Sequence, residues 1–120
     1  MIELSCHCGS VKIEIPRKPR TLTECNCSIC RRTGGRWAYY QAEDVRVRAR
    51  RGALTSYCWG DRMLLLMRCK RCGCVTHWVG AKNPRSGRMG VNTRNVVDPD
   101  VLKDVRIRHL DGARTWTFFD

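Results

Sequence analysis

Cysteines carry the most evident chemistry in this chain, because seven of the nine fall into three short clusters. In Cys69-Lys70-Arg71-Cys72-Gly73, two residues separate the cysteines and a glycine follows, which is the pattern of a zinc knuckle that turns both sulfurs toward one ion. A closed tetrahedral site needs two more ligands, and Cys6-His7-Cys8-Gly9 is the matching half. The sequence therefore predicts a structural zinc site, in preference to four buried free thiols, with the ligands Cys6, Cys8, Cys69 and Cys72.

The middle cluster, Cys25-Asn26-Cys27-Ser28-Ile29-Cys30, has a different character. Its three cysteines lie within six residues and can bind one ion by themselves, which leaves a fourth position for water or substrate. Such open coordination is typical of a catalytic zinc. The alternatives are a second structural site completed by Cys58 or Cys74, or an iron site. We expect Cys58 and Cys74 to be core thiols rather than ligands.

Strands are the elements expected to position these clusters. Residues 11–15 and 45–50 alternate apolar and polar side chains, which is the period of a strand with one buried face. Short helical turns are expected at 29–32 and at 99–102, where Asp98 suits the N-cap and Pro99 the first helical position. The fold class is thus mainly β with antiparallel sheets and one or two helical turns, and further strands are expected at 37–42, 54–59, 63–68, 75–79, 88–93, 105–110 and 115–119.

Length and the N-terminal residues bound the class of protein. A chain of 120 residues predicts one zinc-binding domain over 1–120, with a core modest enough to need a cross-link. The segment Met1–Cys6 has neither the basic nor the apolar region of a signal peptide, and the longest apolar run, Met63–Met67, is too short to cross a bilayer. We therefore expect a cytoplasmic protein that keeps its cysteines reduced and does not enter membranes.

A formal net charge of +12 favours anionic partners such as nucleic acid, a membrane surface or an acidic small molecule. Seven zinc-bound thiolates would lower this charge to about +9. The stripe Arg46, Arg48, Arg50 and Arg51 can bind phosphate, but on an alternating strand it is more simply a solvated face. Likewise, three aromatic residues are better explained as core and pocket walls than as a stacking platform for bases, namely Trp37, Tyr39 and Tyr40.

Taken together, these motifs resemble the glutathione-dependent formaldehyde-activating enzymes, whose relatives include the centromere protein V family. The resemblance covers nearly the whole chain and rests on Cys6-His7-Cys8-Gly9-Ser10-Val11, on Cys25 to Cys30 with the continuation Arg31-Arg32-Thr33-Gly34, on Cys69 to Gly73, and on Val97-Asp98-Pro99 with Leu110-Asp111-Gly112. It implies a tent-like arrangement of small antiparallel sheets and two zinc ions per chain. One would be structural, at Cys6, Cys8, Cys69 and Cys72, and one catalytic, at Cys25, Cys27 and Cys30.

The resemblance implies a carbon-sulfur lyase that adds glutathione, or a related thiol, to formaldehyde or a similar small carbonyl, giving S-hydroxymethylglutathione. Glutathione is anionic, and the arginines beside the middle cluster can pair with its carboxylates or can neutralise the thiolates: Arg31, Arg32 and Arg36. None of the three histidines, His7, His77 and His109, lies in a recognisable catalytic motif, and His7 is the best candidate to support a metal ligand.

Two other functions compete with this reading: a nucleic-acid-binding zinc module and a purely structural zinc domain without catalysis. The middle cluster separates them from the enzyme, because a binding or structural module gains nothing from an open coordination position. The three-cysteine form of that cluster favours the enzyme.

Overall fold

Two β-sheets form the framework of the chain in the computed structural model, which describes residues 1–120. The small sheet is antiparallel and has the order β1-β2-β5, with the bounds Ile2–Ser5, Val11–Ile15 and Arg46–Ala49. The large sheet has the order β10-β3-β4-β9-β8-β7-β6. Its strands are β3 (Thr21–Cys25), β4 (Trp37–Gln41), β6 (Leu54–Tyr57), β7 (Leu64–Cys69), β8 (Val75–Gly80), β9 (Arg88–Asn92) and β10 (Arg106–Leu110).

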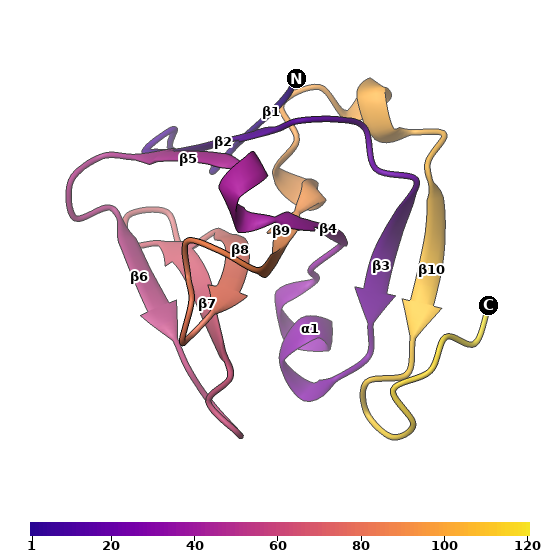
Figure 1. The fold of residues 1–120 in the computed structure, drawn as a ribbon. Coiled ribbons are helices and arrows are strands. Elements are labelled where there is room, and N and C mark those ends of the chain that lie inside the picture. The colour runs from indigo at the N-terminus through magenta and orange to yellow at the C-terminus, as the bar shows by residue number, and fades with distance from the viewer.

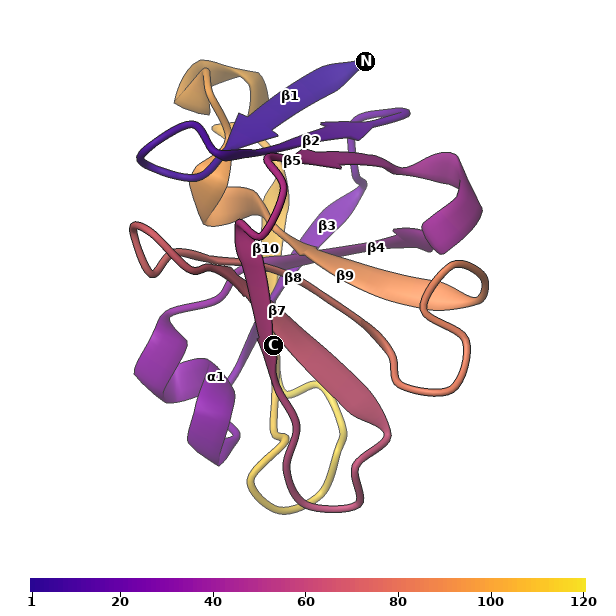
Figure 2. The same ribbon diagram turned by 90° about the vertical axis from the view of Figure 1, so that its left-hand side faces the viewer.

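One short α-helix, α1 (Ser28–Thr33), lies between the two ends of the large sheet, with β6 and β7 on one side and β3 and β10 on the other (Figure 1). The small sheet covers the opposite end of the molecule from α1 (Figures 1 and 2). No helix in the chain has the length and apolar character needed to span a bilayer. Three 3₁₀ turns complete the structure: η1 (Ala42–Asp44), η2 (Thr93–Asn95) and η3 (Pro99–Leu102).

The main core fills the space between the two sheets. Alternate residues of β2 point inward, so Ile13 and Ile15 are buried while Lys12 is exposed, as the period of two predicts. They pack with Leu4 of β1 against a larger set from β3, β4, β8 and β9: Leu22, Ala38, Tyr40, Val79, Met89 and Val91. This apolar contact is the first of two links between the sheets.

The prediction of a mainly β fold is confirmed, with differences in detail. The turn at 99–102 forms as η3, with Asp98 capping and Pro99 in its first turn, and the turn at 29–32 forms as α1. Strands β1 and β3 went unpredicted because Ile2–Ser5 is very short and Thr21–Cys25 alternates weakly before it enters the cysteine cluster. The antiparallel expectation is wrong for one pair, since β10 runs parallel to β3.

The predicted strand at 115–119 is wrong, because the C-terminal segment forms a loop. The carboxylate of Asp111 accepts a hydrogen bond from Thr115 Oγ1 at 3.0 Å, and its carbonyl accepts the Trp116 N–H at 2.7 Å. Trp116 has a φ of 58°, which an extended strand does not allow. Only Phe118 bridges back to Leu110 of β10. Apolar alternation at 115–119 therefore reflects packing against β10 and the site next to it, not strand pairing.

His77 is the one buried histidine, placed on β8 with 4% of its surface exposed. Its Nδ1 lies 2.8 Å from Thr76 Oγ1, and burial lowers the pKa of His77 from its ordinary value of 6.5 to about 4. Between these pH values the unfolded chain binds a proton that the folded chain does not. The contribution of His77 to stability is therefore complete above pH 6.5 and is lost as the pH falls toward 4.

We predict that protonation linked to His77 lowers the unfolding free energy by between about 1 and 2 kcal/mol from pH 6.5 to pH 5, because the slope rises from about half of 1.4 kcal/mol per pH unit to nearly all of it. A His77→Gln variant should show a correspondingly smaller loss over that interval. Urea unfolding at both pH values measures the difference, and because wild type and His77→Gln share both cysteine clusters, proton-driven release of metal affects the two proteins alike. Equal losses in wild type and His77→Gln would contradict the assignment.

Candidate metal centres

Four cysteine sulfurs from distant parts of the sequence meet at one point, and the Sγ atoms of Cys6, Cys8, Cys69 and Cys72 all lie within 4.8 Å of one another. Cys8 Sγ lies 3.7 Å from Cys6 Sγ and 3.6 Å from Cys69 Sγ. A disulfide would need about 2.05 Å. Zinc–sulfur bonds of about 2.3 Å at the tetrahedral angle place neighbouring sulfurs about 3.8 Å apart. The donor set and its spacing therefore fit a tetrahedral zinc ion.

Backbone N–H groups surround these sulfurs, as thiolates require. Val11 N donates to Cys6 Sγ at 3.3 Å, and Cys72 N donates to Cys69 Sγ at 3.5 Å. The backbone N–H of Cys74, directed at the sulfur, lowers the pKa of Cys72 to about 5. Gly73 has a φ of 80°, so the tight turn after Cys72 needs a residue without a Cβ. The knuckle geometry predicted from the sequence is thus present.

This four-cysteine cluster connects the two sheets. Cys6 and Cys8 lie in the turn between β1 and β2, while Cys69 ends β7 and Cys72 lies in the turn before β8. Cys6, Cys69 and Val11 form a small buried cluster of their own, apart from the main core. A metal held here would be the second link between the sheets.

The three-cysteine cluster is local in sequence and sits where β3 passes into α1. Cys25 ends β3, Cys27 is the N-cap of α1, and Cys30 lies in its first turn. Cys27 N donates to Cys25 Sγ at 3.4 Å, and Cys27 Sγ accepts the Cys30 N–H at 3.5 Å. The three Sγ atoms lie within 4.8 Å of one another. Such a set can hold one zinc ion and leaves a fourth position for another ligand.

Burial and mutual proximity act on these thiols together. Burial raises the pKa of Cys25 and of Cys30, and the neighbouring Cys27 charge raises both further. Burial also acts to raise the pKa of Cys27, but hydrogen bonds from Cys30, Cys25 and the Ile29 backbone together outweigh it and leave that pKa lowered. Beside them, the buried Trp37 indole faces Cys30 and acts to lower the pKa of that thiol, and its Nε1 has no other partner. A cation among the sulfurs fits this arrangement, because it offsets the repulsion between buried thiolates. A thiolate sulfur would then be a charged acceptor for the indole N–H.

Cys58 and Cys74 belong to neither cluster. Both are partly exposed rather than fully buried in the core. Cys74 packs against the four-cysteine cluster, and Cys58 follows β6. The alternative in which one of them completes the three-cysteine site receives no support from their positions.

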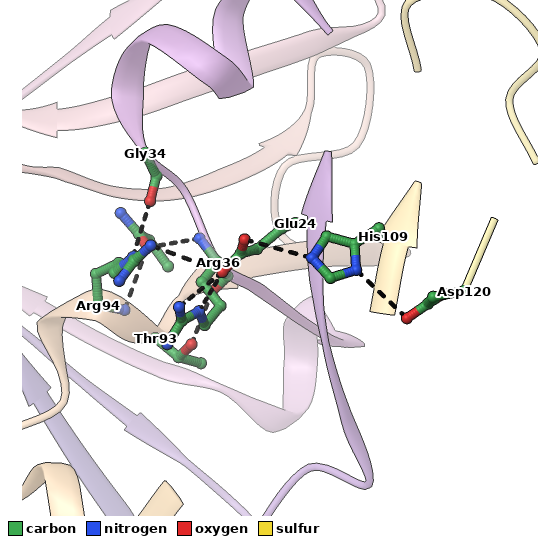
Figure 3. Close-up of polar contacts among 8 residues, drawn as sticks. Glu24, Gly34, Arg36, Thr93, Arg94, His109 and Asp120 are labelled. Carbon is green, nitrogen blue, oxygen red and sulfur yellow. Dashed lines mark hydrogen bonds and ion pairs between the residues drawn. The ribbon is translucent and has the colours of Figure 1, made fainter. Parts of the chain in front are cut away.

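A polar cavity of about 270 Å³ opens on one side of the three-cysteine cluster. Its lining includes Cys25, Cys30 and several polar side chains, Glu24, Asn26, Arg31, Arg94 and His109. Figure 3 shows Glu24 between two arginines and a histidine. Glu24 Oε2 lies 2.7 Å from Arg36 Nε and 3.7 Å from Arg94 Nη2, and Glu24 Oε1 lies 3.8 Å from His109 Nε2. The cavity is therefore a cationic recess in contact with two of the sulfurs.

The three arginines singled out in the sequence separate in the structure. Arg31 lines the polar cavity. Arg32 is exposed and donates to the Ser28 carbonyl of its own helix at 2.8 Å. Arg36 is held by Glu24 and lines a different recess. Arg94 and His109 line the polar cavity together with Arg31. The sequence did not predict them, because η2 and β10 are far from the cysteine cluster in the sequence and approach it only in the folded chain.

A second, apolar cavity of about 150 Å³ adjoins the same three sulfurs. Cys25 and Cys30 line both cavities, so the cluster stands at the boundary between a cationic and an apolar recess. Besides the three cysteines, the apolar cavity is lined by Ile29, Trp37, Tyr39, Trp59, Leu64, Leu66, Trp78, Leu110 and Trp116. The expectation that Trp37 and Tyr39 form pocket walls matches this position.

The C-terminal loop closes one side of the site. Asn26, inside the cysteine cluster, donates to Asp111 Oδ1 at 3.1 Å and accepts the Ala113 N–H at 2.9 Å. Gly112 packs so closely that a Cβ there would overlap Cys25 Sγ and come within 3.1 Å of Cys27 Cβ. The guanidinium carbon of Arg108 lies 3.7 Å from the centre of the Phe118 ring and anchors the segment to β10.

The chain is thus a small β protein with two cysteine clusters that could each hold a metal ion, one of them beside two cavities. The family model of the glutathione-dependent formaldehyde-activating enzymes matches residues 1–108, so this chain belongs to that family. A solved structure of a Rhodobacter sphaeroides protein is similar, with 34% sequence identity and a TM-score of 0.71 over 88% of this chain and 99% of that one. The general class of chemistry is thus glutathione-dependent activation of formaldehyde.

The two clusters should respond differently to mutation, because one joins the sheets and the other is confined to a single loop. We predict that Cys72→Ser unfolds the protein: a structural zinc contributes about 10 kcal/mol or more, which exceeds the stability of many small domains. Cys27→Ser should leave a folded protein that holds one metal ion. Thermal melts combined with elemental analysis test both variants. Equal unfolding of both would mean that the three-cysteine cluster is also structural.

Proposed function

We propose that each cysteine cluster binds one zinc ion and that the three-cysteine site joins a thiol, glutathione or a relative of it, to formaldehyde or a similar small carbonyl. The reaction is of the carbon-sulfur lyase class. The main support is the position of the three sulfurs, which can leave one coordination position free. They lie between two cavities, one with charged side chains in its lining and the other apolar. A structural site would not need either cavity.

The reaction needs no oxidant or further reactant. A carbon-sulfur bond forms between the thiol and the carbonyl carbon, the carbon-oxygen double bond becomes a single bond, and the thiol proton ends on oxygen. A free thiol has a pKa of about 8.5, and a metal at the three sulfurs would, when bound, deprotonate a thiol that coordinates to it.

The chain's own residues supply binding and charge. Arg31 and Arg94 line the polar cavity and can pair with the carboxylates of an anionic thiol such as glutathione. Trp37 Nε1 is a buried donor beside Cys30, so it can stabilise negative charge on the sulfurs. The apolar walls next to the cluster keep water from competing with the thiol.

A nucleic-acid-binding function is the second candidate, and a specific feature favours it. A shallow recess of about 320 Å³ beside the four-cysteine cluster is lined by four cationic side chains, Arg50, Arg51, Lys70 and Arg71. Such a recess suits phosphate groups. It lies on a different set of elements from the three-cysteine site and does not account for the two cavities there.

The enzyme proposal predicts that glutathione changes the visible spectrum of the protein with cobalt at its cysteine sites, because a new thiolate enters the three-cysteine site. The Arg31→Gln and Arg94→Gln variants should each weaken this binding about tenfold, by loss of a charge-assisted hydrogen bond. Arg46→Gln is the matched control, since Arg46 is exposed on β5 and lines neither cavity. Spectral titration measures all four proteins.

An unchanged cobalt spectrum at saturating glutathione would contradict the enzyme proposal. Nucleic-acid binding predicts a different pattern. Affinity for single-stranded DNA would fall steeply with salt, would drop in an Arg50→Gln and Lys70→Gln double variant, and would be indifferent to glutathione.

A further inference from the structure

The apolar cavity at the three-cysteine cluster is larger than formaldehyde requires. It measures about 150 Å³. An apolar protein cavity of about 150 Å³ lined by aliphatic and aromatic side chains stays dry and binds benzene. Formaldehyde, with a single carbon, would leave most of this space empty, and an empty apolar cavity beside a reacting centre forfeits packing energy.

All four tryptophans of the chain line this one cavity, although they come from four separate segments. Trp37 lies on β4 and Trp78 on β8, while Trp59 follows β6 and Trp116 belongs to the C-terminal loop. Tyr39 packs against Trp78 with ring centres 6.0 Å apart, which gives the wall a rigid aromatic corner. Flat aromatic walls favour a flat apolar group between them.

The two cavities meet at Cys25 and Cys30, and this fixes which reactant each can take. The polar cavity, with its arginines, suits the anionic thiol. The apolar cavity has no charged or amide side chain in its lining, so it suits the carbonyl partner's substituent. A carbonyl carbon between the cavities would lie next to the thiol while its substituent fills the apolar side.

From this geometry we propose that the carbonyl substrate of this site is an aldehyde carrying an apolar group of about the size of one aromatic ring, seated in the tryptophan-lined cavity. This inference rests on the proposed function. The bond changes are those given above: the thiol sulfur bonds to the aldehyde carbon, the proton moves to the oxygen, and the product is a hemithioacetal.

Benzyl alcohol, which resembles the aldehyde but does not react with thiols, tests the cavity directly on the metal-loaded protein. In a proton-nitrogen NMR spectrum the four indole N–H signals should shift in a saturable way with benzyl alcohol and not with methanol. Leu64→Trp, which fills the cavity, should abolish the shifts of the four original signals, whereas Met63→Trp should not, because Met63 is 57% exposed and does not line it. Ile29→Trp, at another lining residue, fills the cavity if Leu64→Trp does not fold.

The catalysed rate is then measured with glutathione and either benzaldehyde or formaldehyde, after the rate of the uncatalysed reaction has been subtracted. We expect kcat/KM for benzaldehyde to exceed kcat/KM for formaldehyde by at least about tenfold, because one methylene in an apolar pocket already changes kcat/KM by that much. The cavity-filling variants should lose this preference. Absent indole shifts, or a preference for formaldehyde in wild type, would overturn the substrate assignment while the proposed function stands. No acceleration with either aldehyde would overturn the proposed function, and the substrate assignment with it.

Discussion

Four thiols gathered where the two sheets meet set the conditions for the rest of the structure. Cys8 Sγ lies 3.7 Å from Cys6 Sγ and 3.6 Å from Cys69 Sγ. These distances are too long for disulfides and match the sulfur spacing of a tetrahedral metal site. The small sheet otherwise meets the large one through a limited apolar core around Ile13, Ile15 and Met89. The large sheet curves around α1, so strands from its two ends, β6 and β7 on one side and β3 and β10 on the other, flank the same helix (Figure 1).

That bend creates the second site. One end of the sheet brings β3 and β10, with Cys25 and Leu110, and the other brings Leu64, Leu66 and Trp78. Between them the three-cysteine cluster contacts a cationic recess and an apolar one. Membership of the formaldehyde-activating family gives the general chemistry. We propose the three-cysteine cluster as its site, because each of the two recesses offers a surface that suits the polarity of one reactant.

The cysteine clusters could be predicted from the sequence because metal ligands follow local spacing: Cys69 and Cys72 need one tight turn, and Cys25 to Cys30 need one helix start. Strand β2 could also be predicted, because apolar and polar residues alternate along its whole length. Arg94 and His109 could not be predicted, because each reaches the polar cavity through tertiary structure alone. The tryptophan-lined cavity could not be predicted for the same reason, because its four tryptophans come from four separate segments of the chain. At 115–119, apolar alternation misled because those side chains pack on the site rather than into a sheet.

We propose that this chain holds one closed and one open zinc site. Zinc X-ray absorption combined with elemental analysis can distinguish these sites in protein purified without chelators or added thiols. We expect two zinc ions per chain and, averaged over both, about 3.5 sulfur ligands at about 2.3 Å, because one site offers four cysteines and the other three. A single zinc with four sulfur ligands, or two zinc ions with four each, would contradict it.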